Sequence, residues 1–185
     1  MSTRLLGRDF FNRLTVTVAK DLLGKFLVRK IGGREIALMI TEVEVYDGFK
    51  DKASHVSRGK TARNSIMFGP AGHWYVYFTY GMHWMLNIVT REKDYPAAIL
   101  IRGARSVDGE LNFNGPAKLT KFLKIDGKLN GLVANKKSWL WIESRGIINS
   151  AIHDSLFKIQ QSSRVGVNYA GPYWAKRRWR FYISD

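Results

Sequence analysis

Two pairs of strand-like segments, each joined by a short glycine turn, constrain the fold of this chain most strongly. In the first pair, Gly32-Gly33 separates residues 25–30 from a longer alternating run over residues 35–46. In the second pair, Tyr80-Gly81 follows an aromatic run over residues 74–79 and precedes another apolar run. Short glycine-containing turns between alternating apolar runs are typical of antiparallel β-hairpins. The sequence therefore predicts a mainly antiparallel sheet.

Helical segments occur between these strands. A helix is expected over residues 18–23, with Gly24 ending it in a left-handed conformation. A buried strand is expected over residues 97–102, and a further helix begins near Pro116. The chain has 185 residues, which suits one domain at roughly 150 residues per domain. We therefore expect the α+β class, in a single domain over residues 1–185.

The net charge indicates an anionic partner. Lysine and arginine number 30 against 15 aspartate and glutamate residues, so the chain carries a charge of +15. Both halves of the chain are positive, so the excess is not a detachable basic tail. A compact domain with this charge repels itself, which favours a polyanion such as a nucleic acid as its partner. The alternative is a charged surface that only keeps the protein in solution.

Residue content and spacing exclude several kinds of site. The chain has no cysteine, which excludes a thiol nucleophile, a disulfide framework and a cysteine-ligated metal. The histidines lack the spacing of metal ligands, so no metal is expected; they are His55, His73, His83 and His153. Gly59-Lys60-Thr61 ends like a phosphate-binding loop, but Ser54 stands where that motif requires glycine. No apolar run is long enough to span a membrane.

Four carboxylates within ten residues form a candidate catalytic group; they are Glu42, Glu44, Asp47 and Asp51. Alternation along residues 35–46 gives one face that begins apolar and ends at Glu42 and Glu44. A carboxylate at the end of a buried strand is well placed to act as a base with a shifted pKa. Ion pairing with neighbouring lysine or arginine residues is the alternative. Spacing alone does not choose between Glu42 and Glu44.

The second hairpin carries large residues at its turn. Tyr80 and Met82 flank Gly81, at positions where small polar residues are the usual choice. In the preceding strand, Tyr75 and Tyr77 share one face, and core packing is the ordinary role of such a row. An aromatic turn residue on a basic chain could instead insert between stacked bases.

Several segments of the chain, taken in order, resemble the alkyladenine (3-methyladenine) DNA glycosylase family in its compact bacterial form. They cover residues 40–48, 55–64, 67–73, 75–87, 99–102, 114–119, 164–167 and 180–182. The similarity extends over essentially the whole chain and is weak over residues 127–160. A series of motifs in the same order makes this resemblance more specific than any single motif.

The resemblance implies an enzyme of base excision repair that acts on double-stranded DNA. Such enzymes flip an alkylated or deaminated purine, of the 3-methyladenine, 7-methylguanine, hypoxanthine or ethenoadenine type, out of the duplex. They hydrolyse its N-glycosidic bond with a glutamate-activated water, use no metal or cofactor, and leave an abasic site without strand cleavage. The implied fold is a compact α+β domain with a curved, mainly antiparallel sheet, surrounding helices and a protruding hairpin. A monomer is expected, acting at the DNA of the bacterial cytoplasm or of a nucleus and not at a membrane.

The resemblance also implies roles for individual residues. Glu44 matches the catalytic carboxylate, and Arg102 and the carbonyl of Val165 match groups that help Glu44 to hold the water. Tyr80 matches the residue that fills the gap left by the flipped nucleotide, with Met82 beside it in the turn.

A further set of residues matches the pocket that receives the flipped base. Tyr46, His55 and Tyr77 match its walls. Asn87 matches the residue that crowds the amino group of guanine. A flat, electron-poor ring between aromatic side chains is favourable, above all when alkylation makes the purine cationic.

Two other functions are compatible with part of the sequence. The first is a basic nucleic-acid-binding domain without activity, against which the intact Glu44, Arg102 and Asn87 argue. The second is a sugar hydrolase that uses Glu42 and Glu44 as paired carboxylates, about 5–7 Å apart. The second leaves the charge of +15 and the Tyr80 turn without explanation.

We predict that the affinity of this chain for undamaged duplex DNA falls steeply as salt concentration rises. Binding by a chain with 30 basic residues would release counterions from several phosphates at once. Anisotropy titrations at increasing salt are expected to give a clearly negative slope of log affinity against log salt concentration. A flat slope would remove nucleic acid as the partner.

Overall fold

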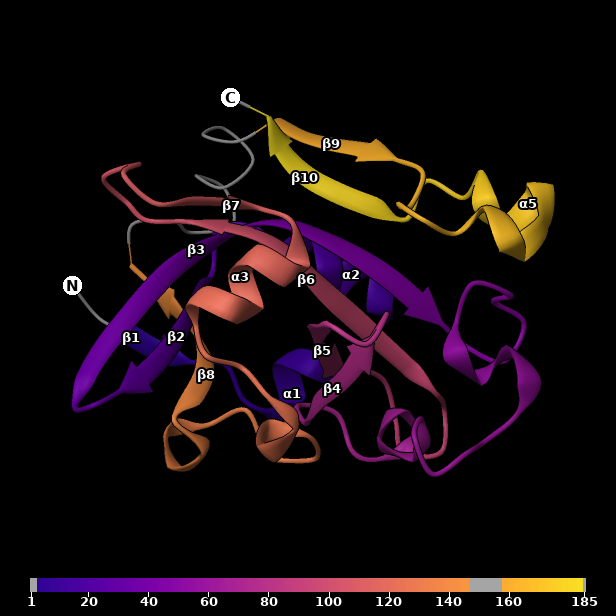
Figure 1. The fold of residues 1–185 in the computed structure, drawn as a ribbon, viewed down its shortest axis with the longest axis horizontal. Helices are drawn as coiled ribbons and strands as arrows, with labels where there is room; N and C mark the ends of the chain where they lie inside the picture. The colour runs from indigo at the N-terminus through magenta and orange to yellow at the C-terminus, as the bar shows by residue number, and fades with distance from the viewer. Residues whose placement is uncertain (1–2, 147–157, 185) are drawn as a thin grey trace.

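β-Strands dominate the protein and form one curved, antiparallel sheet (Figure 1). The structure is a computed structural model that describes residues 3–146 and 158–184. Within these ranges the strands are β1 (Thr3–Leu5), β2 (Phe26–Ile31), β3 (Arg34–Asp47), β4 (Trp74–Thr79), β5 (His83–Val89), β6 (Ala97–Arg105), β7 (Asn112–Asn114), β8 (Leu140–Arg145), β9 (Lys158–Ser162) and β10 (Arg180–Ser184). The α-helices are α1 (Arg8–Phe11), α2 (Thr15–Leu22), α3 (Pro116–Phe122) and α5 (Gly171–Ala175). The short 3-10 turns are η1 (His55–Arg58), η2 (Ser65–Phe68), η3 (Gly127–Leu129), η4 (Lys136–Ser138) and η5 (Asn168–Ala170).

The long strand β3 lies at the centre of the topology. Neighbouring strands follow the order β1-β8-β2-β3-β6-β5-β4. The first part of β3 pairs with β2, and a later part, from Glu42 to Glu44, pairs with β10. β9 extends the sheet beyond β10, and β7 pairs with the end of β6. The predicted α+β class, with a single compact domain and an antiparallel sheet, is confirmed.

The predicted elements are present, with two boundaries displaced by three residues. β6 continues to Arg105, beyond the predicted end at residue 102. α2 begins at Thr15, three residues before the predicted start, and ends at Leu22. The residue in the capping position is Leu14, whose side chain cannot accept a hydrogen bond, so the sequence lacks the usual start signal. Gly24 has a φ of 78°, the left-handed conformation expected there.

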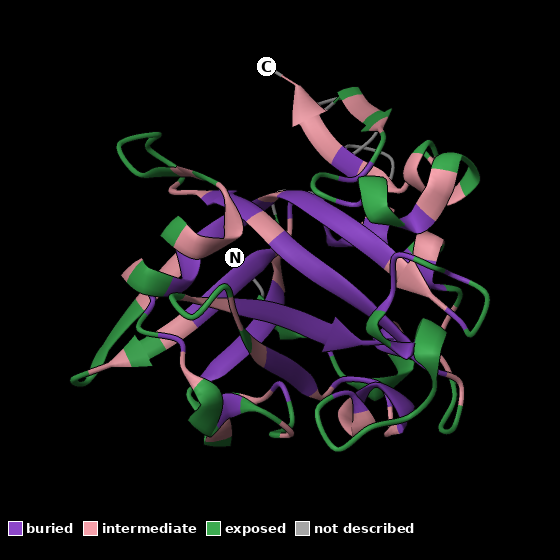
Figure 2. Cartoon of the chain, turned by 45° about the vertical axis from the view of Figure 1, so that its right-hand side comes forward, coloured by how far each residue is buried: buried purple, intermediate pink, exposed green. Residues whose placement is uncertain are grey.

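The hydrophobic core lies against one face of the central strands. Val43 and Val45 of β3 are fully buried there, as are Ile99 and Ile101 of β6. Val18 of α2 belongs to the same cluster. Figure 2 shows that the central strands are buried along most of their length. Each such side chain contributes about 1.5–3 kcal/mol when fully removed from water.

The opposite face of the same strands carries polar and aromatic side chains. Glu44 alternates with Val43 and Val45 and therefore points away from the core. It lies opposite Leu100 of β6, and Leu100 lies opposite Asn87 of β5. Asn87 in turn lies opposite Tyr75 of β4. Because paired residues of antiparallel strands share a face, strand register brings Glu44, Asn87 and Tyr75 into one row.

A buried ion pair fastens the loop after β3 to the C-terminal part of the chain. The side chains of Asp51 and Arg164 are both fully buried. Arg164 donates to the two carboxylate oxygens at 2.6 and 2.9 Å, and to the carbonyl of Val45 at 2.8 Å. Asp51 also accepts from the amide of Ala53 at 3.1 Å. The two segments are thereby held together beside Tyr46.

We predict that Asp51→Asn lowers the free energy of unfolding by about 3–5 kcal/mol, because Arg164 loses its buried partner charge. The matched control is Asp21→Asn, which removes an exposed pair with Arg13 and should cost no more than about 1 kcal/mol. Urea titrations of both variants measure the difference. Equal losses for the two variants would contradict a structural role for the buried pair.

Candidate active site

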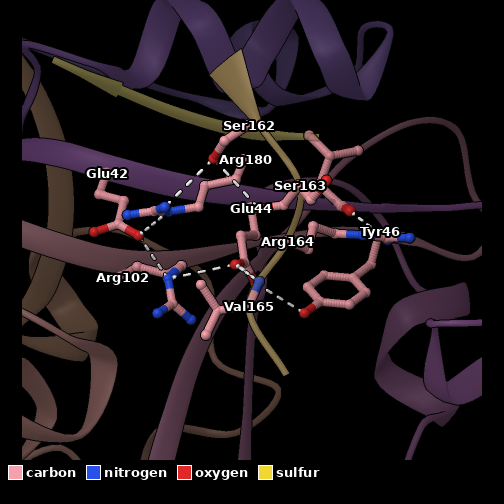
Figure 3. Close-up of polar contacts among 10 residues, drawn as sticks. Glu42, Glu44, Tyr46, Arg102, Ser162, Ser163, Arg164, Val165 and Arg180 are labelled. Atoms are coloured by element: carbon pink, nitrogen blue, oxygen red, sulfur yellow. Dashed lines mark hydrogen bonds and ion pairs between the residues drawn. The ribbon is translucent and has the colours of Figure 1, made fainter. Parts of the chain in front are cut away.

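Glu44 is a fully buried carboxylate that accepts hydrogen bonds from a neighbour on its own strand and from a segment far along the chain. The Tyr46 hydroxyl donates to Oε2 at 2.9 Å, and the Val165 amide donates to Oε1 at 2.7 Å (Figure 3). Burial raises the pKa of the Glu44 carboxyl, and the Arg102 charge and the two hydrogen bonds only partly oppose this. The site therefore holds a carboxylate that is fixed in position and binds a proton more readily than an ordinary carboxylate.

Glu42 lies two residues earlier on the same strand and has a different environment. Arg102 Nε and Arg180 Nε both donate to Glu42 Oε1, at 2.7 and 2.6 Å. Arg102 Nε also lies 3.4 Å from Glu44 Oε1. Glu42 thus forms ion pairs and orders Arg102 beside Glu44. A paired-carboxylate mechanism does not fit, because two guanidinium groups already bind the Glu42 carboxylate.

A local irregularity in the sheet precedes Glu44. The pairing of β3 with β6 shifts its register on both sides of Glu42, where Gly103 is the facing residue. A Cβ on Gly103 would lie 3.1 Å from Glu42 Cβ and from the carbonyl oxygen of Phe113. Glycine therefore permits the close approach of these strands. Such bulges redirect nearby side chains and often occur beside active sites.

An aromatic cavity opens on the same side of the sheet. Its lining consists of Tyr46, Ala53, Ser54, His55, Met67, Tyr75, Tyr77, Asn87 and Tyr169. A wider opening continues from it past Arg102 and Val165 and reaches Tyr80. Tyr46, which donates to Glu44, lines both spaces. The three residues that contact the Glu44 carboxylate, Tyr46, Arg102 and Val165, therefore all line the wider opening.

The four residues expected to form a base pocket all line this cavity; they are Tyr46, His55, Tyr77 and Asn87. The rings of His55 and Tyr77 meet edge to face, with centroids 4.6 Å apart. His55 Nδ1 lies 2.9 Å from the Tyr75 hydroxyl, and burial raises the pKa of Tyr75 to about 12. Asn87 Nδ2 donates to the Tyr75 carbonyl at 3.0 Å, which orients the amide. Their roles toward a base stay predictions.

The turn that carries His55 is held by a buried asparagine. Asn64 Nδ2 donates to the carbonyls of His55 and Gly59, at 3.0 and 2.9 Å. Asn64 Oδ1 accepts from the amide of Thr61 at 2.7 Å. The segment Gly59-Lys60-Thr61 is therefore a loop that Asn64 fastens to the turn carrying His55.

The β4–β5 hairpin ends in a turn with two successive left-handed residues, Tyr80 with a φ of 53° and Gly81 with a φ of 66°. This conformation matches hairpin twist but is unfavourable for a residue with a large side chain. Tyr80 is 83% exposed and Met82 is 65% exposed. Exposure excludes core packing for Tyr80, and a role in DNA stays a prediction.

A comparison with known protein families matches residues 9–185 to the methylpurine-DNA glycosylases. The chain belongs to this family. The family resemblance, the enzyme class and the role in DNA repair expected from the sequence are therefore confirmed. DNA is the partner that membership of this glycosylase family implies.

Relatives that match nearly the whole chain carry the provisional name 3-methyladenine DNA glycosylase. The protein from Methanocella arvoryzae is 42% identical over 98% of this chain and 93% of its own. The protein from Borreliella burgdorferi is 43% identical over 97% of this chain and 96% of its own. The protein from Clostridium perfringens is 39% identical over 97% of this chain and 96% of its own.

Sequence reasoning missed several lining residues of this glycosylase. Tyr169 donates to the carbonyl of Ala53 at 2.9 Å and lines both the cavity and the wider opening. Its signal was weak, because it lies two residues beyond the matching segment 164–167. For Ser54, the sequence indicates only a mismatch to a phosphate-binding motif. The contact of Val165 with Glu44 is made by its amide, whereas the sequence prediction concerned its carbonyl.

Part of the glycosylase lies outside the described residues. The weakly matching segment 127–160 includes residues 147–157, and His153 with them. Within residues 3–146 and 158–184, no three His, Asp or Glu side chains are grouped so that they could hold a metal. In the same ranges, no helix is both long enough and apolar enough to cross a membrane.

Proposed function

We propose that this glycosylase flips alkylated and deaminated purines out of duplex DNA and hydrolyses their N-glycosidic bond with a water activated by Glu44. The observation that carries the proposal is a buried carboxylate beside an aromatic cavity, in a chain with a charge of +15. Purines of the 3-methyladenine, 7-methylguanine, hypoxanthine and ethenoadenine type are flat rings that suit such a cavity. A base must leave the helical stack to enter it.

The proposed reaction is a single displacement by water. The bond between sugar C1′ and purine N9 breaks, and its electron pair leaves with the base. Positive charge develops on the sugar, which the nearby Glu44 carboxylate stabilises. The water oxygen bonds to C1′ while a water proton passes to Glu44. The products are the free base and an abasic site in an intact strand, since no bond forms between enzyme and sugar.

The contacts of Glu44 leave room for this role. The Tyr46 hydroxyl and the Val165 amide occupy two of about four acceptor positions on the carboxylate. The remaining positions can accept from a water. Arg102 and the Val165 carbonyl are proposed to hold that water, and both residues line the wider opening.

The cavity is proposed to select the base. Tyr46, His55 and Tyr77 provide aromatic surfaces for a purine, and a cationic alkylated purine gains further from the ring quadrupoles. Asn87 is held in place by the Tyr75 carbonyl, so it cannot easily move aside for the amino group of guanine. A steric clash of this kind disfavours the normal base more than contacts favour the damaged one.

The hairpin tip is proposed to replace the flipped nucleotide. Tyr80 is exposed at the mouth of the opening that leads to Glu44, with Met82 beside it. An aromatic ring in the gap recovers stacking with the neighbouring bases. The left-handed backbone conformation of Tyr80 lowers the stability of the fold, so a bulky residue at this position is better explained by a role in DNA binding than by folding.

We predict that Glu44→Gln lowers single-turnover base release by at least about 100-fold, a typical loss for a general base. The amide oxygen can still accept from the Val165 amide, and the amide NH2 can donate to the Tyr46 hydroxyl oxygen with the direction of that bond reversed, so the melting temperature should change little. Glu42→Gln is the matched control and should have a much smaller effect, because Glu42 only orders Arg102. Equal rates for the wild type and Glu44→Gln would contradict the assignment.

We predict that Tyr80→Ala changes the free energy of unfolding by less than about 0.5 kcal/mol, as for other surface residues. Tyr75→Ala, at a position only 2% exposed, should cost about 3 kcal/mol or more. Base release by Tyr80→Ala should fall by the worth of one base stack, about 1–3 kcal/mol.

Release by Tyr80→Ala from a mispaired lesion should fall less than release from a paired one, because less pairing must be broken. Melting curves and release rates on the two duplexes measure these effects. A large loss of stability without preferential rescue by the mismatch would show that Tyr80 is structural.

A further inference from the structure

Arg63 places a fixed positive charge beside the aromatic cavity. Its Nη2 donates to the carbonyl oxygen of Phe78 at 2.9 Å, which ties the guanidinium to β4. The guanidinium carbon lies over the face of the Tyr77 ring, 5.2 Å from the ring centre. Within residues 3–146 and 158–184, no carboxylate forms an ion pair with Arg63. Its charge is therefore not offset by a neighbouring side chain.

The charge of Arg63 acts on three residues that line the cavity; they are His55, Tyr75 and Tyr77. Burial lowers the pKa of His55, and the Arg63 charge lowers it further. Burial raises the pKa of Tyr75 and of Tyr77, and the Arg63 charge opposes both rises. All three effects have the sign of a positive potential at the cavity wall. This potential is present whichever way a base lies in the cavity.

A positive potential distinguishes damaged purines by their charge. Nucleotides of 7-methylguanine and 3-methyladenine are cationic, whereas that of hypoxanthine is neutral. When the glycosidic bond breaks, its electron pair moves to the base, so an alkylated base leaves neutral and an unprotonated hypoxanthine leaves as an anion. The neutral lesion therefore carries one positive charge fewer both on entering the cavity and on leaving the sugar. A nearby cation favours it over the cationic lesion at both stages.

We propose, on the basis of the proposed function, that Arg63 sets the charge preference of the cavity and keeps neutral damaged purines competitive with cationic ones. The aromatic wall alone favours cationic bases. One face of Tyr77 already binds a guanidinium, and the Arg63 charge repels a second cation, so part of that advantage is lost. Arg63 lies outside the lining of the cavity and acts through its charge, without touching the base.

The test is a competition in which a duplex with 7-methylguanine and a duplex with hypoxanthine react in one solution. Such a reaction measures the ratio of the two kcat/KM values. Arg63→Gln removes the charge but can still donate to the Phe78 carbonyl. The ratio of 7-methylguanine to hypoxanthine release should rise about three- to tenfold, a moderate change because Arg63 is exposed to solvent. Both lesions meet the same enzyme, so a loss of folded protein does not alter the ratio.

Two control variants separate charge from other roles of Arg63. Arg63→Lys keeps the positive charge, and its ratio should stay within about twofold of the wild type. Arg58→Gln removes another exposed positive charge from the nearby turn η1. Arg58→Gln should weaken binding of both duplexes alike and leave the ratio unchanged, because a contact with a phosphate carries no information about the base.

The outcomes distinguish this inference from the proposed function. An unchanged ratio for Arg63→Gln would overturn the inference, since Arg63 would then serve both lesions equally, as a phosphate contact does. Equal rises for Arg63→Gln and Arg63→Lys would also overturn it, because charge would not be the cause. In either case release of both lesions by the wild type leaves the proposed function standing. Absence of release by the wild type would overturn the proposed function, and this inference with it.

Discussion

The buried pair of Asp51 and Arg164 holds both walls of the site against the sheet. Arg164 precedes Val165 directly, so the contacts that fix its guanidinium also bring the Val165 amide to Glu44. Asp51 lies at the start of the loop that forms the other wall, and it accepts from the amide of Ala53. Because both ions are buried, each depends on the other for its charge compensation. The position of Glu44 between these walls therefore depends on an interaction that does not touch the carboxylate.

Two features of the site cost stability, and both lie along the path proposed for the base. Glu44 is a carboxylate removed from water, which raises its pKa. Tyr80 places a large exposed ring on a left-handed turn residue. Folding alone favours neither arrangement, whereas flipping and hydrolysing a nucleotide would use both.

The sheet, and the strands that bring Glu44, Asn87 and Tyr75 into one row, could be predicted from local sequence. Alternation and glycine turns indicated β3 and the β4–β5 hairpin, because strand periodicity depends only on neighbouring residues. The choice between Glu42 and Glu44 could not be predicted from spacing, since both share a face. It depends on Arg180 and Val165, which lie more than 100 residues away in the chain and arrive only through tertiary packing.

Other parts of the site depend on information that a residue pattern does not contain. A serine before a short helical turn indicates an ordinary helix cap, and only the folded structure shows that the Ser54 hydroxyl caps no amide. Tyr169 follows a matching motif but does not belong to it, and its place in the cavity comes from the 3-10 turn η5. The start of α2 was missed because Leu14 gives no capping signal.

The central claim is that an ionised Glu44 with a raised pKa accepts a proton from the attacking water. Single-turnover release of 7-methylguanine as a function of pH tests it most directly, because this cationic base can depart without being protonated. Burial places the pKa of Glu44 above the ordinary value of 4.5, so the carboxylate is protonated and inactive at the acidic end. The rate should therefore rise with pH through a single ionisation above 4.5 and then reach a plateau. A rate that is constant over this range, or that falls as pH rises, would contradict the account.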